Sequence, residues 1–318
     1  MEVDNDGNLI SEILIELGKV NQYRGDDIQA LEFYNLAIES AEQVNNYRLL
    51  GTCYSSIGNI FRVLGAYDES LSSIVRAKSN YELAGFVEGS AWISYTIGRL
   101  YRDLGIQDEA KTTFGESLEI YTSQAEINGD SMGVALCLDQ LGMINLKLNE
   151  PALAKIDIQR SLHIYTENKS EYGLSNAQKN MGKIAYTLGE YSNAEKFLEQ
   201  SLDTKIRIDD ALGIPGIYIY LGLTLIAEDQ WQVGMDILQV GLVKAKNNHQ
   251  RQIQFEIYGH MAKAFEDKGQ LAEALKYYKL QFNHQDLILA DPVRFKLPEL
   301  RGIYEMEQSR QKIKSLNP

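Results

Sequence analysis

The chain has 318 residues, of which 44% are hydrophobic and 24% are charged, and only five are proline. This composition is typical of a well-folded protein and argues against a disordered one. The net charge is -13, which argues against a general nucleic-acid or anionic-membrane surface, because both need a basic footprint.

Nothing in the sequence predicts export or membrane insertion. The first twenty residues are acidic and lack the basic start and apolar run of a secretory signal. The longest nearly apolar run, residues 214–227, is shorter than the ~20 residues of a spanning helix. Two cysteines, Cys53 and Cys137, are too few for a disulfide framework and suit a reducing compartment. We therefore expect a cytoplasmic protein.

The sequence repeats itself about every 40 residues. IGNIFRVLGAYDES at 57–70 returns as IGRLYRDLGIQDEA at 97–110. A small residue after an apolar one marks each copy, and we call these seven positions the anchors: Gly18, Gly58, Gly98, Gly142, Gly182, Gly222 and Ala262. They are 40 residues apart, except for 44 between the third and fourth. A period of 20 to 50 residues indicates a repeat architecture.

Each copy predicts a helical hairpin. The apolar residues Cys53, Ile57, Ile60 and Leu64 have the spacing of one helix face. Seven residues after each anchor stands a residue that tolerates the left-handed conformation ending a helix: Gly25, Gly65, Gly105, Asn149, Gly189, Asp229 and Gly269. Five residues later comes a small residue of the second helix: Ala30, Ser70, Ala110, Ala154, Ala194, Gly234 and Ala274.

In chain order, we predict an N-terminal tail at 1–8, a solenoid of seven hairpins at 9–282, and a C-terminal capping or linker helix at 283–318, with about fifteen helices in all. The four extra residues of the third copy are expected near 122–130, in the joint between hairpins. Pro151 and Pro215 are expected in the first turn of a helix, where a missing donor costs little.

The anchor glycines should oppose folding unless something compensates. A glycine inside a helix costs about 1 kcal/mol relative to alanine. Close approach of the paired helix, possible only where no side chain intervenes, is the expected compensation.

The pattern resembles the tetratricopeptide repeat, whose residue types appear in the third copy as Ile97, Gly98, Tyr101, Gly105, Ala110, Phe114 and Ser117. The copies around Gly142 and Gly222 depart from it, with Asn145 and Leu225 at the aromatic position. The resemblance implies an all-α, right-handed superhelix that binds a protein or peptide segment in a concave groove without a cofactor.

The C-terminal sequence resembles the junction where such repeats lead into a bacterial histidine kinase or diguanylate cyclase. The matching residues are Tyr277, Tyr278, Lys279, Asp286, Glu299, Leu300, Tyr304, Glu305, Glu307, Ile313 and Leu316. Pro292 and Pro298 depart from that pattern, and a helix capping the solenoid explains the same stretch. This resemblance implies a sensory or docking region of a signalling protein. The alternatives are an intracellular peptide-pheromone receptor and a free-standing scaffold adaptor.

The face of the first helices opposite their apolar stripe predicts the binding groove. The candidate residues are Lys19, Asn59, Arg62, Tyr95, Arg99, Arg102, Lys179, Asn180, Lys183, Tyr186, Ile219 and Leu223. Their cations suggest a dock for an acidic segment. Ion pairs with acidic residues of adjacent hairpins explain the same cations. Asn180 and Lys183 resemble part of the carboxylate clamp of some tetratricopeptide proteins, although the full set is absent.

No sequence motif predicts catalysis or a metal site. Phosphate-binding, nucleophile-elbow and zinc-protease motifs are absent, and the four histidines lack ligand spacing. Each histidine is expected to be a surface or groove residue, and His260, beside Met261 on a groove-side turn, is the one of most interest. Cys53 and Cys137 fill the same apolar position in two copies and are expected to be buried and unpaired. We therefore predict a binding protein rather than an enzyme, with no metal and no nucleic-acid partner.

Overall fold

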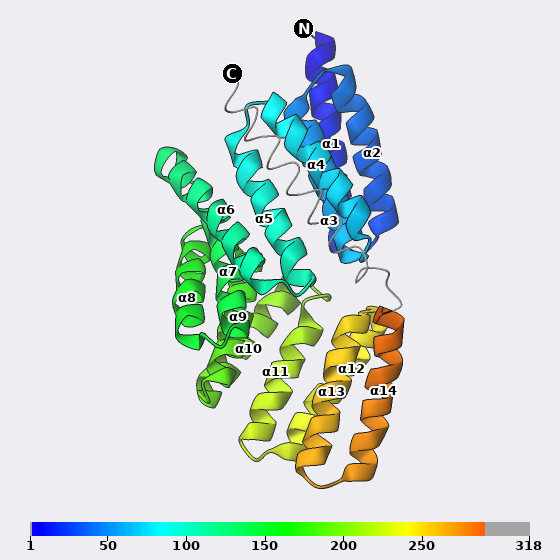
Figure 1. Ribbon diagram of the computed structural model, residues 1–318, viewed down its shortest axis with the longest axis vertical. Coiled ribbons are helices and arrows are strands. Elements are labelled where there is room, and N and C mark those ends of the chain that lie inside the picture. The colour runs from blue at the N-terminus through cyan, green and yellow to red at the C-terminus, as the bar shows by residue number, and fades with distance from the viewer. Residues whose placement is uncertain (1, 290–318) are drawn as a thin grey trace. The chain divides into compact units, whose positions relative to one another are not determined.

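The protein is built from helices alone. The computed structural model describes the backbone of residues 2–289 and the side chains of residues 7–284. Residues 2–289 form fourteen helices and contain no strand (Figure 1). The predicted all-α fold of helix-turn-helix repeats is confirmed.

The helices alternate as first and second members of hairpins. The first helices are α1 (Glu2–Tyr23), α3 (Tyr47–Val63), α5 (Val87–Asp103), α7 (Met132–Lys147), α9 (Glu171–Thr187), α11 (Ile214–Ala227) and α13 (Arg251–Asp267). The second helices are α2 (Asp27–Gln43), α4 (Tyr67–Leu83), α6 (Gln107–Asn128), α8 (Pro151–Glu167), α10 (Tyr191–Arg207), α12 (Trp231–Asn247) and α14 (Leu271–Leu289). Pro151 and Pro215 lie in the first turns of α8 and α11, as predicted.

Every predicted turn inside a hairpin has the left-handed backbone conformation. The seven predicted stops have φ between 62° at Asn149 and 79° at Gly105. Glycine adopts this conformation without strain, and asparagine and aspartate do so more readily than other residues. The hairpin turns were therefore correctly predicted from residue types alone.

The helices form two compact units. Helices α1–α5 belong to unit 1, which ends at Gly105, and α6–α14 belong to unit 2, which begins at Ile106. The boundary between the two units falls inside the third hairpin of the solenoid expected over residues 9–282.

The predicted ends of the repeat region differ from the observed helices. Helix α1 begins at Glu2, so the stretch expected as a tail is its first turns. Ser40 of α2 donates a hydrogen bond to the Gly7 carbonyl at 3.0 Å, and Asn46 donates to Asn8 Oδ1 at 2.7 Å. These contacts give the first turns of α1 a packing partner. Helix α14 runs past residue 282 to Leu289, and the rest of the predicted C-terminal helix lies outside the described residues.

The four extra residues of the third copy lengthen a helix. Helix α6 has 22 residues, against 17 in α2, α4, α8, α10 and α12. It ends at Gly129, with φ 77°, whose backbone N–H donates to the Ala125 carbonyl. The extra residues were predicted in the right segment, 122–130, but as part of the connection between two hairpins. Most of this segment instead continues helix α6, because the first residue with the left-handed conformation is Gly129.

The anchor glycines lie against the second helix of their own hairpin. A Cβ atom at Gly182 would lie 2.5 Å from the Leu198 side chain and 3.3 Å from the Ala194 carbonyl. A Cβ at Gly142 would meet Ile158 at 2.7 Å in the same way. Gly18, Gly58 and Gly222 repeat this arrangement. The close helix approach is thus confirmed at these five anchors, and it operates inside each hairpin.

The first helices form a continuous layer within each unit. Cα atoms come within 8 Å of each other between α1 and α3 and between α3 and α5 in unit 1. The same holds in unit 2 for α7 with α9, α9 with α11, and α11 with α13, whereas the described second helices make no such contacts with one another. In each unit the first helices are therefore closer to one another than the second helices are. The candidate residues lie on these first helices.

Candidate functional site

Six of the predicted groove residues lie in unit 1. Lys19 forms an ion pair with Glu16 of its own helix at 2.7 Å. The other five lie on α3 and α5, namely Asn59, Arg62, Tyr95, Arg99 and Arg102. Arg62 and Tyr95 are buried, with exposed fractions of 6% and 5%, because successive first helices cover them.

The other six lie in unit 2 on α9 and α11. Lys179, Asn180, Lys183 and Tyr186 follow one another along α9, and Ile219 and Leu223 lie on α11. Asn180 and Ile219 are buried, whereas the remaining four are partly exposed. The structure therefore places four predicted groove residues, Arg62, Tyr95, Asn180 and Ile219, inside the first-helix layer.

A buried carboxylate lies beneath the α9 residues. Asp139 of α7 is 5% exposed and accepts hydrogen bonds from Ser161 at 2.7 Å and from Tyr165 Oη at 3.4 Å. Burial raises the pKa of Asp139 to about 6. The hydrogen bonds from Ser161, Tyr165 and Asn180 and the charge of Lys179 limit that rise.

Lys179 is a cation with no direct partner among the described side chains. Its ammonium makes neither a hydrogen bond nor an ion pair with any described residue. Burial and the neighbouring charges of Lys183 and Lys205 together lower the pKa of Lys179 to about 8, while Asp139 and Asp210 oppose the change. The charged groups near Lys179 are thus two cations, Lys183 and Lys205, and two carboxylates, Asp139 and Asp210.

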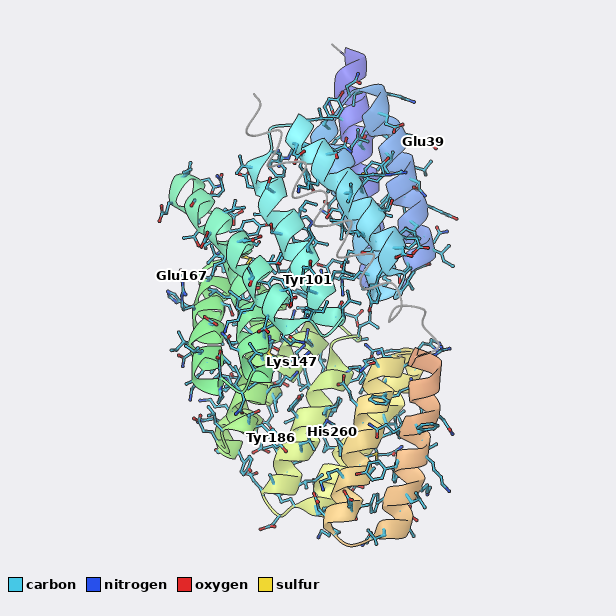
Figure 2. The ribbon with its side chains drawn as sticks, in the orientation of Figure 1. Glu39, Tyr101, Lys147, Glu167, Tyr186 and His260 are labelled. Carbon is cyan, nitrogen blue, oxygen red and sulfur yellow. The ribbon has the colours of Figure 1, made fainter. Side chains whose placement is uncertain are left out.

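An aromatic surface adjoins these lysines. The Lys183 ammonium lies 4.7 Å from the centre of the Tyr220 ring, and the Tyr186 and Tyr220 rings pack edge to face with ring centres 6.0 Å apart. Figure 2 labels Tyr186 on α9 and His260 on α13. Burial lowers the pKa of His260, and Lys183 adds to this effect while Glu256 opposes it. We call Lys179, Lys183, Tyr186, Tyr220, Leu223 and His260 the unit 2 face.

The sequence analysis did not identify a second buried charged group, the ion pair of Lys205 with Asp210, although the sequence contains a signal for it. Tyr81, Tyr121 and Tyr165 stand 23 residues after their anchors and cover glycines of the following first helix, but Lys205 takes that position after Gly182. Its side chain is 1% exposed and its ammonium binds Asp210 Oδ2 at 2.6 Å. A lysine at a position held by tyrosine in three copies and by alanine in two, Ala41 and Ala245, could have identified this buried ion pair.

The described residues contain no group of three or more histidine, cysteine, aspartate or glutamate side chains arranged for a metal ion. None of the helices in residues 2–289 combines the length and apolar character needed to cross a bilayer. Cys53 and Cys137 are both buried and unpaired, as predicted. Their thiols have pKa values raised by burial to about 12.

Comparisons with known proteins identify the repeat. A family model for the tetratricopeptide repeat matches residues 93–123 and 177–205. Protein kinesin light chain-related 2 of Arabidopsis thaliana is 24% identical over 190 residues, which cover 58% of this chain and 28% of that protein. Kinesin light chain-related 1 of the same plant is 25% identical over 193 residues, covering 58% and 30%. The chain thus spans less than a third of the length of either relative.

Solved structures share the fold at low sequence identity. The Rap conjugation gene regulator of plasmid pLS20, in complex with the Phr* peptide, has a TM-score of 0.72 and 17% identity, covering 89% of this chain and 74% of that one. The apo form of RapI has a TM-score of 0.65 and 15% identity, covering 88% and 99%. A STAND protein with a tetratricopeptide repeat sensor from Pyrococcus horikoshii has a TM-score of 0.57 and 15% identity, covering 87% and 43%.

The family match, the left-handed hairpin turns and the anchor glycines packed against their paired helices agree on one kind of repeat. The chain therefore contains tetratricopeptide repeats.

Proposed function

We propose that the chain is a non-catalytic protein- or peptide-binding module of a bacterial signalling system, and that its ligand lies on the unit 2 face. The observation that carries this proposal is Lys179, a largely desolvated cation without an acceptor among the described residues. A ligand carboxylate at this place gains a charge-assisted hydrogen bond, which is about twice as strong as a neutral one.

The surroundings of Lys179 favour a segment with both an acidic and an apolar group. Tyr186, Tyr220 and Leu223 are partly exposed beside the lysines, and tyrosine supplies large contact area at low entropic cost. A short acidic peptide with a bulky apolar side chain fits this combination, because the cation and the rings then bind different parts of one ligand.

The proposal has three biological forms. In the first, the chain is the cytoplasmic sensory or docking region of a histidine kinase or diguanylate cyclase. In the second, it is an intracellular peptide-pheromone receptor. The second is favoured by the fold likeness to the Rap regulator in complex with the Phr* peptide. A free-standing scaffold adaptor, like a light chain, is a third form and is suggested by the curated relatives. A receptor should become more compact when it binds a free peptide, which small-angle scattering measures.

A defined peptide array tests the proposal on the unit 2 face. Hexapeptides with one acidic and one aromatic or aliphatic residue in a Gly-Ser background are compared with the same peptides carrying Lys or Gln at the acidic position. We expect binding only with the acidic residue, and a roughly tenfold or greater loss in Lys179→Gln and in Lys183→Gln, because each removes a charge-assisted hydrogen bond.

Lys196→Gln provides the matched control. Lys196 lies exposed on the second helix α10 of the same unit, so its replacement changes the net charge equally without touching the unit 2 face. Affinity that is independent of the acidic residue, or that falls as much in Lys196→Gln, would contradict the proposal.

A further inference from the structure

Successive hairpins pack on each other through a recurring apolar contact. At the junction of α12 with α13, one cluster contains Met235, Leu238 and Leu242 of α12 and Ile257, Met261 and Ala264 of α13. The residues at the positions of Leu238, Ile257 and Met261 share one cluster in the same way where α2 meets α3, α4 meets α5, α8 meets α9 and α10 meets α11. The second helix of one hairpin therefore covers an apolar side of the next first helix and is covered by it.

Helix α1 carries the same apolar side without this cover. Its residues Ile13, Leu17 and Val20, which we call the α1 face, are 52%, 41% and 44% exposed. By their spacing from the anchor they correspond to the α13 residues of the junction. The six residues that correspond to Ile13 are at most 3% exposed: Cys53, Ile93, Cys137, Ala177, Ile217 and Ile257. The described residues contain no second helix before α1, so this apolar side faces solvent.

Helix α14 carries the opposite half of the contact, also without cover. Its residues Leu275, Tyr278 and Phe282, which we call the α14 face, are 55%, 38% and 60% exposed. They correspond to Met235, Leu238 and Leu242 of α12, which are 5%, 0% and 3% exposed. No first helix follows α14 among the described residues. Solenoids are normally closed by terminal repeats with a polar outer side, and neither end of the described repeats has one.

We propose that the α14 face of one copy of this chain packs on the α1 face of a second copy, so that the chain assembles head to tail. The contact would reproduce the junction of α12 with α13, because both faces have the apolar residue types that already pack together inside the chain. The α1 face lies in unit 1 and the α14 face in unit 2, so each face is complete within one unit. A second copy covers both faces, whereas residues 290–318 of the same chain, as a cover for one face, would leave the other exposed.

The charges beside the two faces favour this pairing over a contact between two α1 faces. Glu12 borders the α1 face and Lys279 borders the α14 face, and both are exposed without an ion pair to any described residue. A contact between two α1 faces brings Glu12 of both copies to one interface, which costs free energy, whereas the head-to-tail contact combines opposite charges. A head-to-tail interface is heterologous, so it produces a closed ring or an open chain of copies rather than a symmetric dimer.

Sedimentation velocity of the full chain tests the assembly. The protein is measured from about 1 to about 100 μM, at an ionic strength of about 0.15 M that screens repulsion between copies of net charge -13. We expect the average mass to rise with concentration beyond that of two chains. Ile13→Lys disrupts the α1 face and Leu275→Lys disrupts the α14 face. Each should lower the association constant by at least roughly tenfold, because an unpaired ammonium would be buried in the contact.

An equimolar mixture of the two variants distinguishes the head-to-tail contact from a symmetric one. Each variant keeps the face that the other has lost, so the mixture should form a complex of one copy of each, with the mass of two chains and no larger species. Formation of this complex also shows that both variants are folded. Ile156→Lys is the matched control, because Ile156 of α8 is 52% exposed like Ile13 and belongs to neither face. This variant should associate like the parent.

Four results would overturn the inference. They are a parent chain that keeps the mass of one copy at every concentration, a face variant that associates like the parent, a mixture without a complex, or an Ile156→Lys variant that loses association as much as the face variants. The first would leave the faces to residues 290–318 or to another protein, and association lost only in Ile13→Lys would indicate a contact between two α1 faces. Neither face shares a residue with the unit 2 face, so peptide binding and assembly can each fail without the other.

Discussion

Replacing Gly222 by alanine adds one methyl group where α11 and α12 are in close contact. The new Cβ would lie 2.8 Å from the Gly234 carbonyl oxygen and 2.7 Å from Leu238 Cγ. Gly234 replaces the alanine of other copies, and a Cβ there would lie 2.5 Å from the Gly222 carbonyl oxygen. A backbone carbonyl cannot rotate away like a side chain, so the two helices must separate.

The magnitude follows from two opposing effects. Alanine is favoured over glycine in a helix by about 1 kcal/mol, and overpacking a well-packed contact costs about 1–3 kcal/mol. Gly216 lies in the same helix α11, and a Cβ there would meet no atom within 4 Å. Gly216→Ala should therefore raise the free energy of unfolding by up to about 1 kcal/mol. Gly222→Ala should be less stable than Gly216→Ala by about 1–3 kcal/mol, because the helix propensity cancels.

Urea unfolding followed by far-UV circular dichroism measures this difference. The dependence of the unfolding free energy on urea must be the same in both variants, because repeat proteins can unfold in parts. Should Gly222→Ala prove as stable as Gly216→Ala, the explanation of the anchor glycines by close helix approach would be refuted.

Two further predictions concern the buried charges of unit 2. The pKa of Asp139, about 6, exceeds its ordinary value of 3.8, so between about pH 4 and 6 the folded protein keeps a proton that the unfolded chain has lost, and stability should fall as pH rises. In Asp139→Asn, the free energy of unfolding should no longer fall between about pH 4 and 6, and at pH 7 it should be about 1–3 kcal/mol higher than in the parent. An unchanged dependence on pH would contradict the raised pKa of Asp139. Lys205→Met should lower the free energy of unfolding by roughly 3 kcal/mol because Asp210 loses its ammonium partner, and adding Asp210→Asn should recover most of the loss in chemical denaturation. A single variant as stable as the parent would show that the pair contributes nothing.

The hairpin turns and the tight helix contacts were predictable from residue types. A glycine, asparagine or aspartate seven residues after each anchor adopts the left-handed conformation, and this preference belongs to the residue and its immediate neighbours. The close approach at Gly142 and Gly182 was equally predictable, because a glycine in mid-helix is unfavourable unless another chain segment needs the space.

The state of each charged side chain was not predictable in this way. The same sequence reasoning placed Arg62, Arg99 and Lys179 on one face of the first helices. In the structure Arg62 is buried against Asp103, Arg99 lies over Tyr95, and Lys179 has no acceptor among the described residues. The difference depends on which acidic residues the adjacent hairpins bring near.

The sequence by itself determined the all-α hairpin repeat and its turns, because these depend on residues within one hairpin, such as Gly182 and Leu198, and the period is visible from the recurrence of the same residue types. Only the tertiary structure decided the boundary between the units after Gly105, the burial of Lys205, and the absence of an acceptor for Lys179 among the described residues. The physical reason is the distance along the chain between partners. Arg62 and Asp103 are 41 residues apart, so their contact depends on how one hairpin packs on the next.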